Sequence, residues 1–128
     1  MLHIPGLFMA SSEGKGYGMF TAHDLTEGDI IEICTYILIP AHQLAAIHQT
    51  VLHDYYFLMP EDDGTACLLL GYGSLYNHSS NANVEVIFDV PNGRVELEAI
   101  RDIQAGEELL IDYTGGLKKE DVLWFEEL

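Results

Sequence analysis

Three short segments of the 128-residue chain carry side chains that suit chemistry on a small ligand. The first is the glycine-rich turn Gly14-Lys15-Gly16-Tyr17-Gly18, which precedes Met19-Phe20. Glycines let the backbone approach a ligand closely and present N–H groups to a carboxylate or a phosphate, and Lys15 adds a positive charge. The turn lacks the Gly-Lys-Ser/Thr ending of a P-loop. An ordinary surface loop is the alternative interpretation.

The second segment is rich in asparagine and spans Gly71 to Asn83, with Asn77-His78-Ser79 near its middle. Asparagine and histidine supply hydrogen-bond donors and acceptors that suit a purine edge or an amino group. The third segment, Gly106 to Tyr113, has the pattern of a turn, a short apolar strand and then a tyrosine. The plainer alternatives are an asparagine-rich turn and a core tyrosine at the end of a strand.

Together and in this order, the three segments resemble the motifs of the SET-domain family of protein lysine methyltransferases. Gly16-Tyr17-Gly18 resembles the family's Gly-x-Gly motif, and Asn77-His78-Ser79 with Asn83 resembles its Asn-His-Ser-x-x-x-Asn motif. The segment from Gly106 to Tyr113 resembles its Gly-Glu-Glu-Leu...Asp-Tyr motif. The resemblance covers most of the chain, whose length is similar to that of the small stand-alone SET proteins of viruses and bacteria.

The resemblance implies an enzyme that transfers a methyl group from S-adenosylmethionine to a lysine side chain. Tyr113 is the implied catalytic residue, and Tyr55, in the segment Asp54-Tyr55-Tyr56-Phe57, is a second one. The lysine channel is implied to be lined by Tyr55, Ile111 and Tyr113. The implied cofactor-binding residues are Lys15, Gly16, Tyr17, Gly18, Asn77, His78 and Trp124. Phe125 is an alternative to Trp124, and core packing is the competing interpretation of both aromatic side chains.

The implied chemistry is an in-line methyl transfer from a sulfonium to a neutral amine. A free lysine has a pKa of ~10.4, so its deprotonation at pH 7 costs roughly 4 to 5 kcal/mol. An apolar channel and an adjacent sulfonium both lower that pKa. Tyr113 would orient the amine and stabilise the polarised methyl group. At Ile111 the family often has phenylalanine or tyrosine, and a tyrosine hydroxyl there limits methylation, so di- or trimethylation is implied to be allowed.

The charge balance of the chain points to a basic partner. It has 21 acidic and 5 basic residues, which gives a formal net charge of -16. Because lysine and arginine carry phosphate binding, direct nucleic-acid binding is not expected. A negative surface attracts basic proteins. With the resemblance, the expected substrate is a lysine-rich protein tail, such as that of a histone or histone-like protein, with a ribosomal protein as a further alternative that the acidic surface fits equally. A merely solvated acidic surface is one alternative, and a catalytically silent SET fold that acts as an acidic binding module for basic proteins is another.

The segments that must position these residues are mostly strand-like. An isoleucine-rich run from Asp29 to Ile39 predicts a buried strand that stops at Pro40. Two β-hairpins are predicted, one from residues 84–90 with 95–99 and one from residues 55–58 with 65–70. The predicted fold class is mostly β, a β-clip-like SET domain of several small sheets. The resemblance adds a pseudoknot-like threading of the C-terminal strand through the asparagine-rich loop.

Two segments have helical spacing. Leu44, Ile47, Val51 and Leu52 predict a helix between strands, and a second helix is predicted over 117–128. One SET domain is expected over residues 1–128, with the 117–128 helix closing the cofactor site. That helix and the run Leu68-Leu69-Leu70 are candidates for homodimer contacts, with core packing as the alternative.

Neither the cysteines nor the histidines indicate a metal site. Cys34 and Cys67 form no Cys-x-x-Cys pair, so two reduced, packed thiols are expected rather than a disulfide or zinc. His42, His48 and His53 do not match His-Glu-x-x-His and are expected to be exposed helix residues. The sequence has no secretory leader pattern and no apolar run that would span a membrane. We therefore expect a soluble intracellular protein, nuclear or chromatin-associated if the target is a histone and otherwise cytoplasmic.

Overall fold

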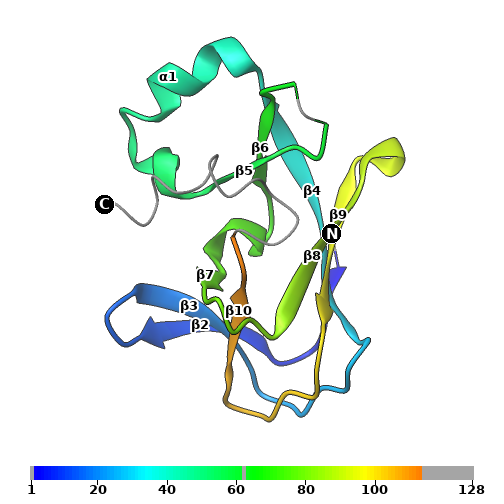
Figure 1. The fold of residues 1–128 in the computed structure, drawn as a ribbon. Helices are drawn as coiled ribbons and strands as arrows, with labels where there is room; N and C mark the ends of the chain where they lie inside the picture. The colour runs from blue at the N-terminus through cyan, green and yellow to red at the C-terminus, as the bar shows by residue number, and fades with distance from the viewer. Residues whose placement is uncertain (1, 62, 114–128) are drawn as a thin grey trace.

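The computed structural model describes residues 2–61 and 63–113 of the chain, so the predicted 117–128 helix, with Trp124 and Phe125, lies outside the described residues. Strands joined by tight turns make up most of the described chain (Figure 1). They are β1 (Leu2–His3), β2 (Leu7–Ser12), β3 (Gly16–Thr21), β4 (Ile30–Ile39), β5 (Tyr56–Leu58), β6 (Ala66–Leu69), β7 (Asn77–His78), β8 (Val84–Asp89), β9 (Arg94–Ala99) and β10 (Glu108–Ile111). The helical segments are α1 (Leu44–Ile47) and the 3₁₀ turns η1 (Ala41–Gln43), η2 (Val51–Asp54), η3 (Gly73–Leu75) and η4 (Val90–Asn92).

The strands pair in the order β2-β3-β10-β8-β9-β4-β6-β5, with β1 added against β4 and β7 against β10. The β2–β3 hairpin projects to one side of the molecule, and β5 and β6 lie at the end that carries α1 (Figure 1). This arrangement of small, connected sheets confirms the predicted mostly β fold class. None of the helices among the described residues is long and apolar enough to cross a membrane.

Strand β10 lies where the sheets meet. It runs antiparallel to β3 but parallel to both β7 and β8. Ile111 stands opposite both His78 and Val84, so the 79–83 loop that joins β7 to β8 passes around the end of β10. This is the predicted pseudoknot-like threading, and it brings the asparagine-rich loop against the strand that leads to Tyr113.

The predicted strand and hairpins are confirmed to within a few residues. β4 begins at Ile30 and ends before Pro40, and both β8–β9 and β5–β6 are antiparallel pairs. The turn between β8 and β9 is the 3₁₀ segment η4 followed by Gly93, which has a φ of 65°. Only the last residue of this turn is left-handed, and a glycine there avoids the steric cost that a Cβ would bring.

The predicted helix over Leu44 to Leu52 is broken into two parts. α1 ends after one turn, and the separate 3₁₀ segment η2 begins at Val51. Thr50 separates the two parts, because its hydroxyl donates to the carbonyl of Ile47 (2.8 Å) and accepts from the amide of Leu52 (3.2 Å). Such local bonds offer the backbone an alternative to helix continuation. Leu44 and Ile47 pack inward as expected, whereas Val51 is 74% exposed.

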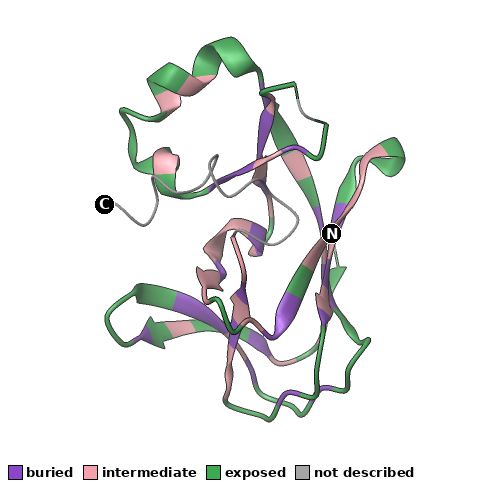
Figure 2. Cartoon of the chain, viewed as in Figure 1, coloured by how far each residue is buried: buried purple, intermediate pink, exposed green. Residues whose placement is uncertain are grey.

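Buried side chains form one main core and a smaller one. Buried residues recur along the strands, where they alternate with intermediate and exposed ones (Figure 2). Met19, Leu97 and Leu109 are completely enclosed in the main core. The smaller core lies beneath α1. Leu69 belongs to the main core and Leu68 packs against the smaller one, so this part of the candidate dimer segment has a packing role within the monomer.

Both cysteines are buried and free, as predicted. Burial raises the pKa of the Cys67 thiol to about 12, and burial together with the neighbouring Glu32 carboxylate raises the pKa of Cys34 to about 12. The histidine prediction holds for His42 and His48, which are exposed, but it is wrong for His53, which is half-buried. The ring of His53 meets that of His48 edge to face.

Candidate active site

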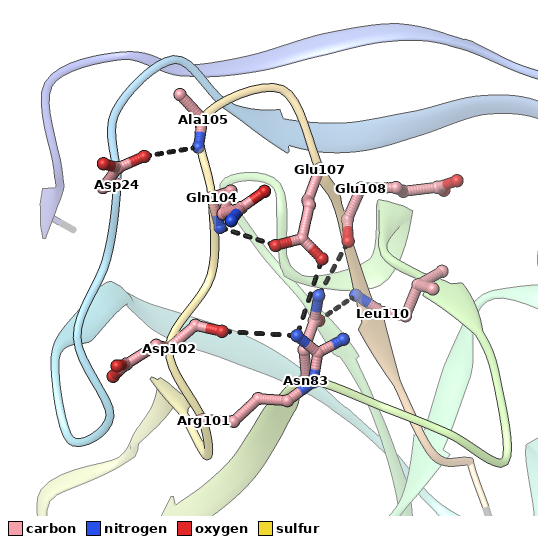
Figure 3. A network of polar contacts seen from close by, with 9 residues as sticks. All are labelled: Asp24, Asn83, Arg101, Asp102, Gln104, Ala105, Glu107, Glu108 and Leu110. Carbon is pink, nitrogen blue, oxygen red and sulfur yellow. Dashed lines mark hydrogen bonds and ion pairs between the residues drawn. The ribbon is translucent and has the colours of Figure 1, made fainter.

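Asn83 ties the asparagine-rich loop to β10. Its side chain is 1% exposed, accepts a hydrogen bond from the amide of Leu110 (2.7 Å) and donates one to the carbonyl of Glu108 (2.9 Å). The amide of Asn83 also donates to the carbonyl of Leu110 (3.1 Å). Figure 3 shows the Asn83 side chain reaching β10 beside the Arg101–Glu107 ion pair, which holds the preceding turn. The loop and the strand are therefore fastened together before the chain reaches Tyr113.

Tyr113 stands at the end of β10 with both its main chain and its hydroxyl bonded to the loop. The hydroxyl donates to the main-chain carbonyl of Tyr76 (2.9 Å), and the amide donates to Nδ1 of His78 (3.0 Å). The phenol ring lies 4.9 Å from the His78 ring and meets Phe57 edge to face at 6.2 Å. These contacts place the hydroxyl in one position at the junction of β10, β7 and β5.

The environment of Tyr113 keeps its hydroxyl protonated. Burial, followed by the nearby Asp54 carboxylate and Tyr55, raises the pKa of Tyr113 to about 12. The phenol is therefore a hydrogen-bond donor over the whole neutral range and not a base. Tyr55 itself is 36% exposed and follows directly after η2.

The His78 ring has a defined tautomer. A main-chain amide can only donate, so Nδ1 of His78 must accept from Tyr113, and the proton of a neutral ring then sits on Nε2. The carboxylate of Asp112 lies 3.9 Å from the same Nδ1, which is beyond hydrogen-bond distance. We therefore assign the amide bond, and not an ion pair with Asp112, as the contact that orients this ring.

The glycine-rich turn lies directly beside the asparagine-rich loop. Lys15 Nζ donates to the main-chain carbonyl of His78 (3.2 Å), and Asn77 Nδ2 donates to the carbonyl of Tyr17 (3.0 Å). Asn77 Nδ2 also donates to Glu108 Oε2 (2.8 Å). The structure thus brings together the predicted residues Lys15, Gly16, Tyr17, Gly18, Asn77 and His78.

The two glycines of the Gly-x-Gly motif have different surroundings. Gly16 has a φ of +76° and open space where a Cβ would stand, so a ligand can lie against its backbone. A Cβ on Gly18, in contrast, would overlap the Glu108 carboxylate and the Asn77 amide. Among the described residues, no group donates to Asn77 Oδ1. An open backbone surface, a lysine ammonium and a carbonyl acceptor suit a ligand that carries both a carboxylate and an ammonium group, as the methionine end of S-adenosylmethionine does.

Ile111 is 1% exposed and packs in the main core. It also lines a cavity of about 380 Å³, together with the loop residues Ser80, Asn81 and Ala82 and the carboxylate-bearing Glu85 and Asp112. The residue two positions before Tyr113 is thus apolar and carries no hydroxyl. Trp124, predicted to cover the adenine, lies outside the described residues.

Several residues of this site were not singled out from the sequence. Glu108 lies within the third segment and Tyr76 within the second, so their positions could have signalled them, but Ser12 and Glu32 belong to none of the three segments. Glu32 is 2% exposed and accepts hydrogen bonds from the Tyr76 hydroxyl (2.8 Å) and the Tyr72 amide (2.9 Å). Burial and the Glu32 charge hold the pKa of Tyr76 well above its ordinary value. This buried carboxylate therefore anchors the segment whose carbonyl receives the Tyr113 hydroxyl.

Comparisons with known proteins agree with this geometry. The model of the SET domain family matches residues 16–114. A Schizosaccharomyces pombe histone-lysine N-methyltransferase specific for lysine 37 of histone H3 is 32% identical over 94% of this chain and 78% of its own length. The histone-lysine N-methyltransferase EZH2 of Chaetomium thermophilum is 30% identical over 79% of this chain, which spans only 8% of that protein.

Solved structures show the same fold. A Plasmodium falciparum protein assigned as a histone methyltransferase superposes with a TM-score of 0.63 at 30% identity, over 84% of this chain and 92% of its own. The ctPRC2 structure bound to S-adenosylmethionine gives a TM-score of 0.70 at 23% identity, over 95% of this chain and 17% of that one, and supports the fold alone.

The chain belongs to the SET domain family. The predicted family is thereby confirmed, and with it the enzyme class of lysine methyltransferases and their cofactor S-adenosylmethionine. The roles predicted for single residues stay predictions, because the comparisons do not test them.

Proposed function

We propose that this chain is a protein-lysine N-methyltransferase that modifies a lysine in the tail of a histone or histone-like protein. The observation that supports it most is the convergence of Tyr113 with the carbonyl of Tyr76 and the ring of His78. Motifs more than 30 residues apart in the chain meet there, and they hold one phenol hydroxyl against the asparagine-rich loop. A scaffold for protein binding would need no such alignment.

The site residues divide into two groups. Lys15, Gly16, Tyr17, Gly18, Asn77 and His78 would hold S-adenosylmethionine, with its carboxylate and ammonium at the open side of the turn. The bound cofactor supplies an electrophilic methyl group on a positively charged sulfur. Tyr113 would orient the amine of the substrate lysine, and Tyr55 and Ile111 would line its channel.

The properties of Tyr113 suit methyl transfer better than proton abstraction. Because its pKa is raised to about 12, the phenol remains a neutral donor at pH 7 and cannot remove the lysine proton as a phenolate. The lysine must therefore lose its proton by another route before transfer, at a cost of roughly 4 to 5 kcal/mol at pH 7 for an unperturbed ammonium. A channel lined by aromatic and aliphatic side chains lowers that cost, because it disfavours the charged form.

The substrate class follows from charge and from the relatives. With a formal net charge of -16, the chain attracts a lysine-rich tail and repels nucleic acid. Two relatives that are at least 30% identical to this chain are named as histone-lysine N-methyltransferases. A histone substrate would place the protein in the nucleus, at chromatin.

The test is transfer of a radiolabelled methyl group from S-adenosylmethionine to core histones, with poly-arginine as a basic polymer that contains no lysine. We expect labelled histone, unlabelled poly-arginine, and a rate that falls as salt rises, because screening weakens the attraction of opposite charges. Histone binding without label would favour the acidic binding module. Failure to bind either the cofactor or histones would refute the proposed function.

A further inference from the structure

We propose that Glu108 is a positioning residue that fixes the orientation of the Asn77 amide, so that the Asn77 carbonyl oxygen faces the ammonium group of the cofactor. The inference rests on the proposed function, since it assumes that S-adenosylmethionine binds beside the glycine-rich turn. Glu108 would not touch the cofactor. Its effect would pass through one hydrogen bond to Asn77.

Both side-chain donors of Asn77 have a partner. A side-chain amide has two N–H donors on Nδ2, and Asn77 directs Nδ2 to the carbonyl of Tyr17 (3.0 Å) and to Glu108 Oε2 (2.8 Å). Both partners can only accept. The amide therefore cannot be turned over without setting Oδ1 against two oxygens, and in the observed orientation Oδ1 faces away from both.

Glu108 is itself held from two sides. Ser12 donates its hydroxyl to Glu108 Oε1 (2.7 Å) while Asn77 donates to Oε2, so each carboxylate oxygen has a donor. At the main chain, the Glu108 carbonyl accepts from Asn83. Figure 3 shows that the Glu108 side chain extends away from that carbonyl and from Asn83. The carboxylate is thus aimed at the β3 side of the strand, toward the glycine-rich turn.

Gly18 supports this arrangement independently. Its φ is not in the left-handed region, so backbone conformation does not require glycine there. A Cβ at this position would instead overlap the Glu108 carboxylate and approach Asn77 Nδ2. The second glycine of the Gly-x-Gly motif is therefore explained by the space that the Glu108–Asn77 bond occupies. Gly16, with open space around it, is the glycine that leaves room for a ligand.

The orientation has a chemical consequence. An ammonium group can only donate hydrogen bonds, so it is stabilised by Oδ1 and repelled by Nδ2. Hydrogen bonds that involve a charged group contribute more than neutral ones. Without Glu108, Asn77 would keep only its bond to Tyr17 and could present its NH₂ group to the cofactor site.

The test measures binding of S-adenosylhomocysteine by calorimetry, which needs no turnover. Glu108→Ala should weaken binding by roughly 10-fold or more, in line with the loss of a hydrogen bond to a charged group. Glu108→Gln keeps an acceptor for Asn77 and should stay within about 3-fold of the wild type, since Ser12 can rotate to accept from the new amide. Glu107→Ala is the matched control, because the Glu107 carboxylate contacts Arg101 and the main-chain amide of Gln104 instead of the cofactor site.

A swap of donor and acceptor separates positioning from simple structural support. Asn77→Asp alone sets two carboxylates against each other and should bind poorly. In the double variant Asn77→Asp with Glu108→Gln, the new glutamine can donate to the new aspartate, whose second oxygen faces the ligand. The double variant should therefore bind more tightly than Asn77→Asp alone, a coupling that a double-mutant cycle measures directly.

Each outcome bears on the inference. It is overturned if Glu108→Ala binds as well as the wild type while remaining folded by circular dichroism, or if the double variant is no better than Asn77→Asp. If Glu108→Ala fails to fold, the swap and Glu108→Gln still decide the matter. If the wild type does not bind S-adenosylhomocysteine at all, both this inference and the proposed cofactor site fail. Normal wild-type binding with uncoupled variants removes this inference alone.

Discussion

The hydroxyl of Tyr113 donates a 2.9 Å hydrogen bond to the main-chain carbonyl of Tyr76, which links the end of β10 to the residue just before the Asn77-His78 strand. A main-chain carbonyl cannot rotate away, so it holds the phenol more firmly than a side-chain acceptor would. The Tyr76 side chain is in turn anchored to Glu32. The position of the candidate catalytic hydroxyl is therefore set by contacts that extend from β4 to β10.

Tyr113→Phe should abolish most methyl transfer while leaving cofactor binding intact. The variant removes one hydroxyl that would orient the reacting groups, and loss of one such donor lowers turnover by on the order of 10²–10³-fold in other enzymes. Its affinity for S-adenosylhomocysteine should stay within about 3-fold of the wild type. Tyr36→Phe, which removes a hydroxyl on β4, is the control and should retain activity. Unchanged turnover in Tyr113→Phe would remove Tyr113 from the mechanism.

Stability should fall at alkaline pH. The thiols of Cys34 and Cys67 have pKa values raised from 9.0 to about 12 in the folded protein. Below pH 9 both states keep these protons and the stabilisation is complete. Between pH 9 and 12 the unfolded chain releases them while the folded chain does not, so stability decreases by up to about 1.4 kcal/mol per pH unit for each thiol. Tyr113, raised from 10.0 to about 12, adds the same effect above pH 10.

The measurement is the free energy of unfolding in urea at several pH values between 7 and 11. Cys67→Ala lacks one of the titrating thiols and should show a shallower decline than the wild type above pH 9. It should also be less stable at pH 7, because it leaves a small cavity in the core. A decline equally steep in the variant would show that Cys67 has an ordinary pKa.

Much of the fold could be predicted from local pattern. Alternating apolar residues and turn glycines located the β8–β9 and β5–β6 hairpins, and the motifs named residues of the candidate site that the structure brings together. The extent predicted for the helix over 44–52 was wrong, because the hydroxyl of Thr50 bonds to the main chain of Ile47 and Leu52 and the helix is interrupted there. The spacing of apolar residues indicates which side chains could share a helix face. It does not indicate a local hydrogen bond that competes with the helix.

Glu32 shows why the rest was not predictable. Its neighbours are isoleucines, so strict alternation would give Glu32 and Ile31 opposite faces of the strand. The pairing of β4 with β9 instead shifts register between Ile30 and Glu32, and both Ile31 and Glu32 are buried. A bulge of this kind depends on the partner strand, more than 60 residues away. Glu108 and Ser12 likewise meet across 96 positions, which no local pattern records.

Glu32→Ala should destabilise the protein strongly. The change leaves the Tyr76 hydroxyl and the Tyr72 amide without their acceptor inside the core, at a cost of roughly 2 to 4 kcal/mol. Glu32→Gln keeps one carbonyl acceptor and should cost less. Glu13→Ala, at an exposed position, should leave the free energy of unfolding unchanged in the same urea titration. Equal stability of Glu32→Ala and the wild type would contradict the anchoring role.

Asn83→Ala should loosen the junction of loop and strand. It removes two hydrogen bonds from a side chain that is 1% exposed, and leaves the Leu110 amide without its side-chain acceptor. We expect a loss of roughly 2 to 3 kcal/mol in the free energy of unfolding. Asn81→Ala is the matched control, because Asn81 is exposed and only its main chain bonds to Ser79. Hydrogen exchange at Leu110 should quicken in Asn83→Ala alone.

The product of an exhaustive reaction should include di- or trimethyl lysine. Addition of a second methyl requires that the channel admit a larger amine and hold no water-binding hydroxyl at position 111. Ile111, two residues before Tyr113, is apolar and buried, and its side chain can only contribute van der Waals contacts. Ile111→Tyr should shift the products toward monomethyl lysine. Ile111→Phe introduces a ring of the same size as that of tyrosine but without the hydroxyl, and it should shift the products less. Mass spectrometry of a histone tail peptide after prolonged reaction measures this, and monomethyl lysine alone from the wild type would contradict the assignment of Ile111.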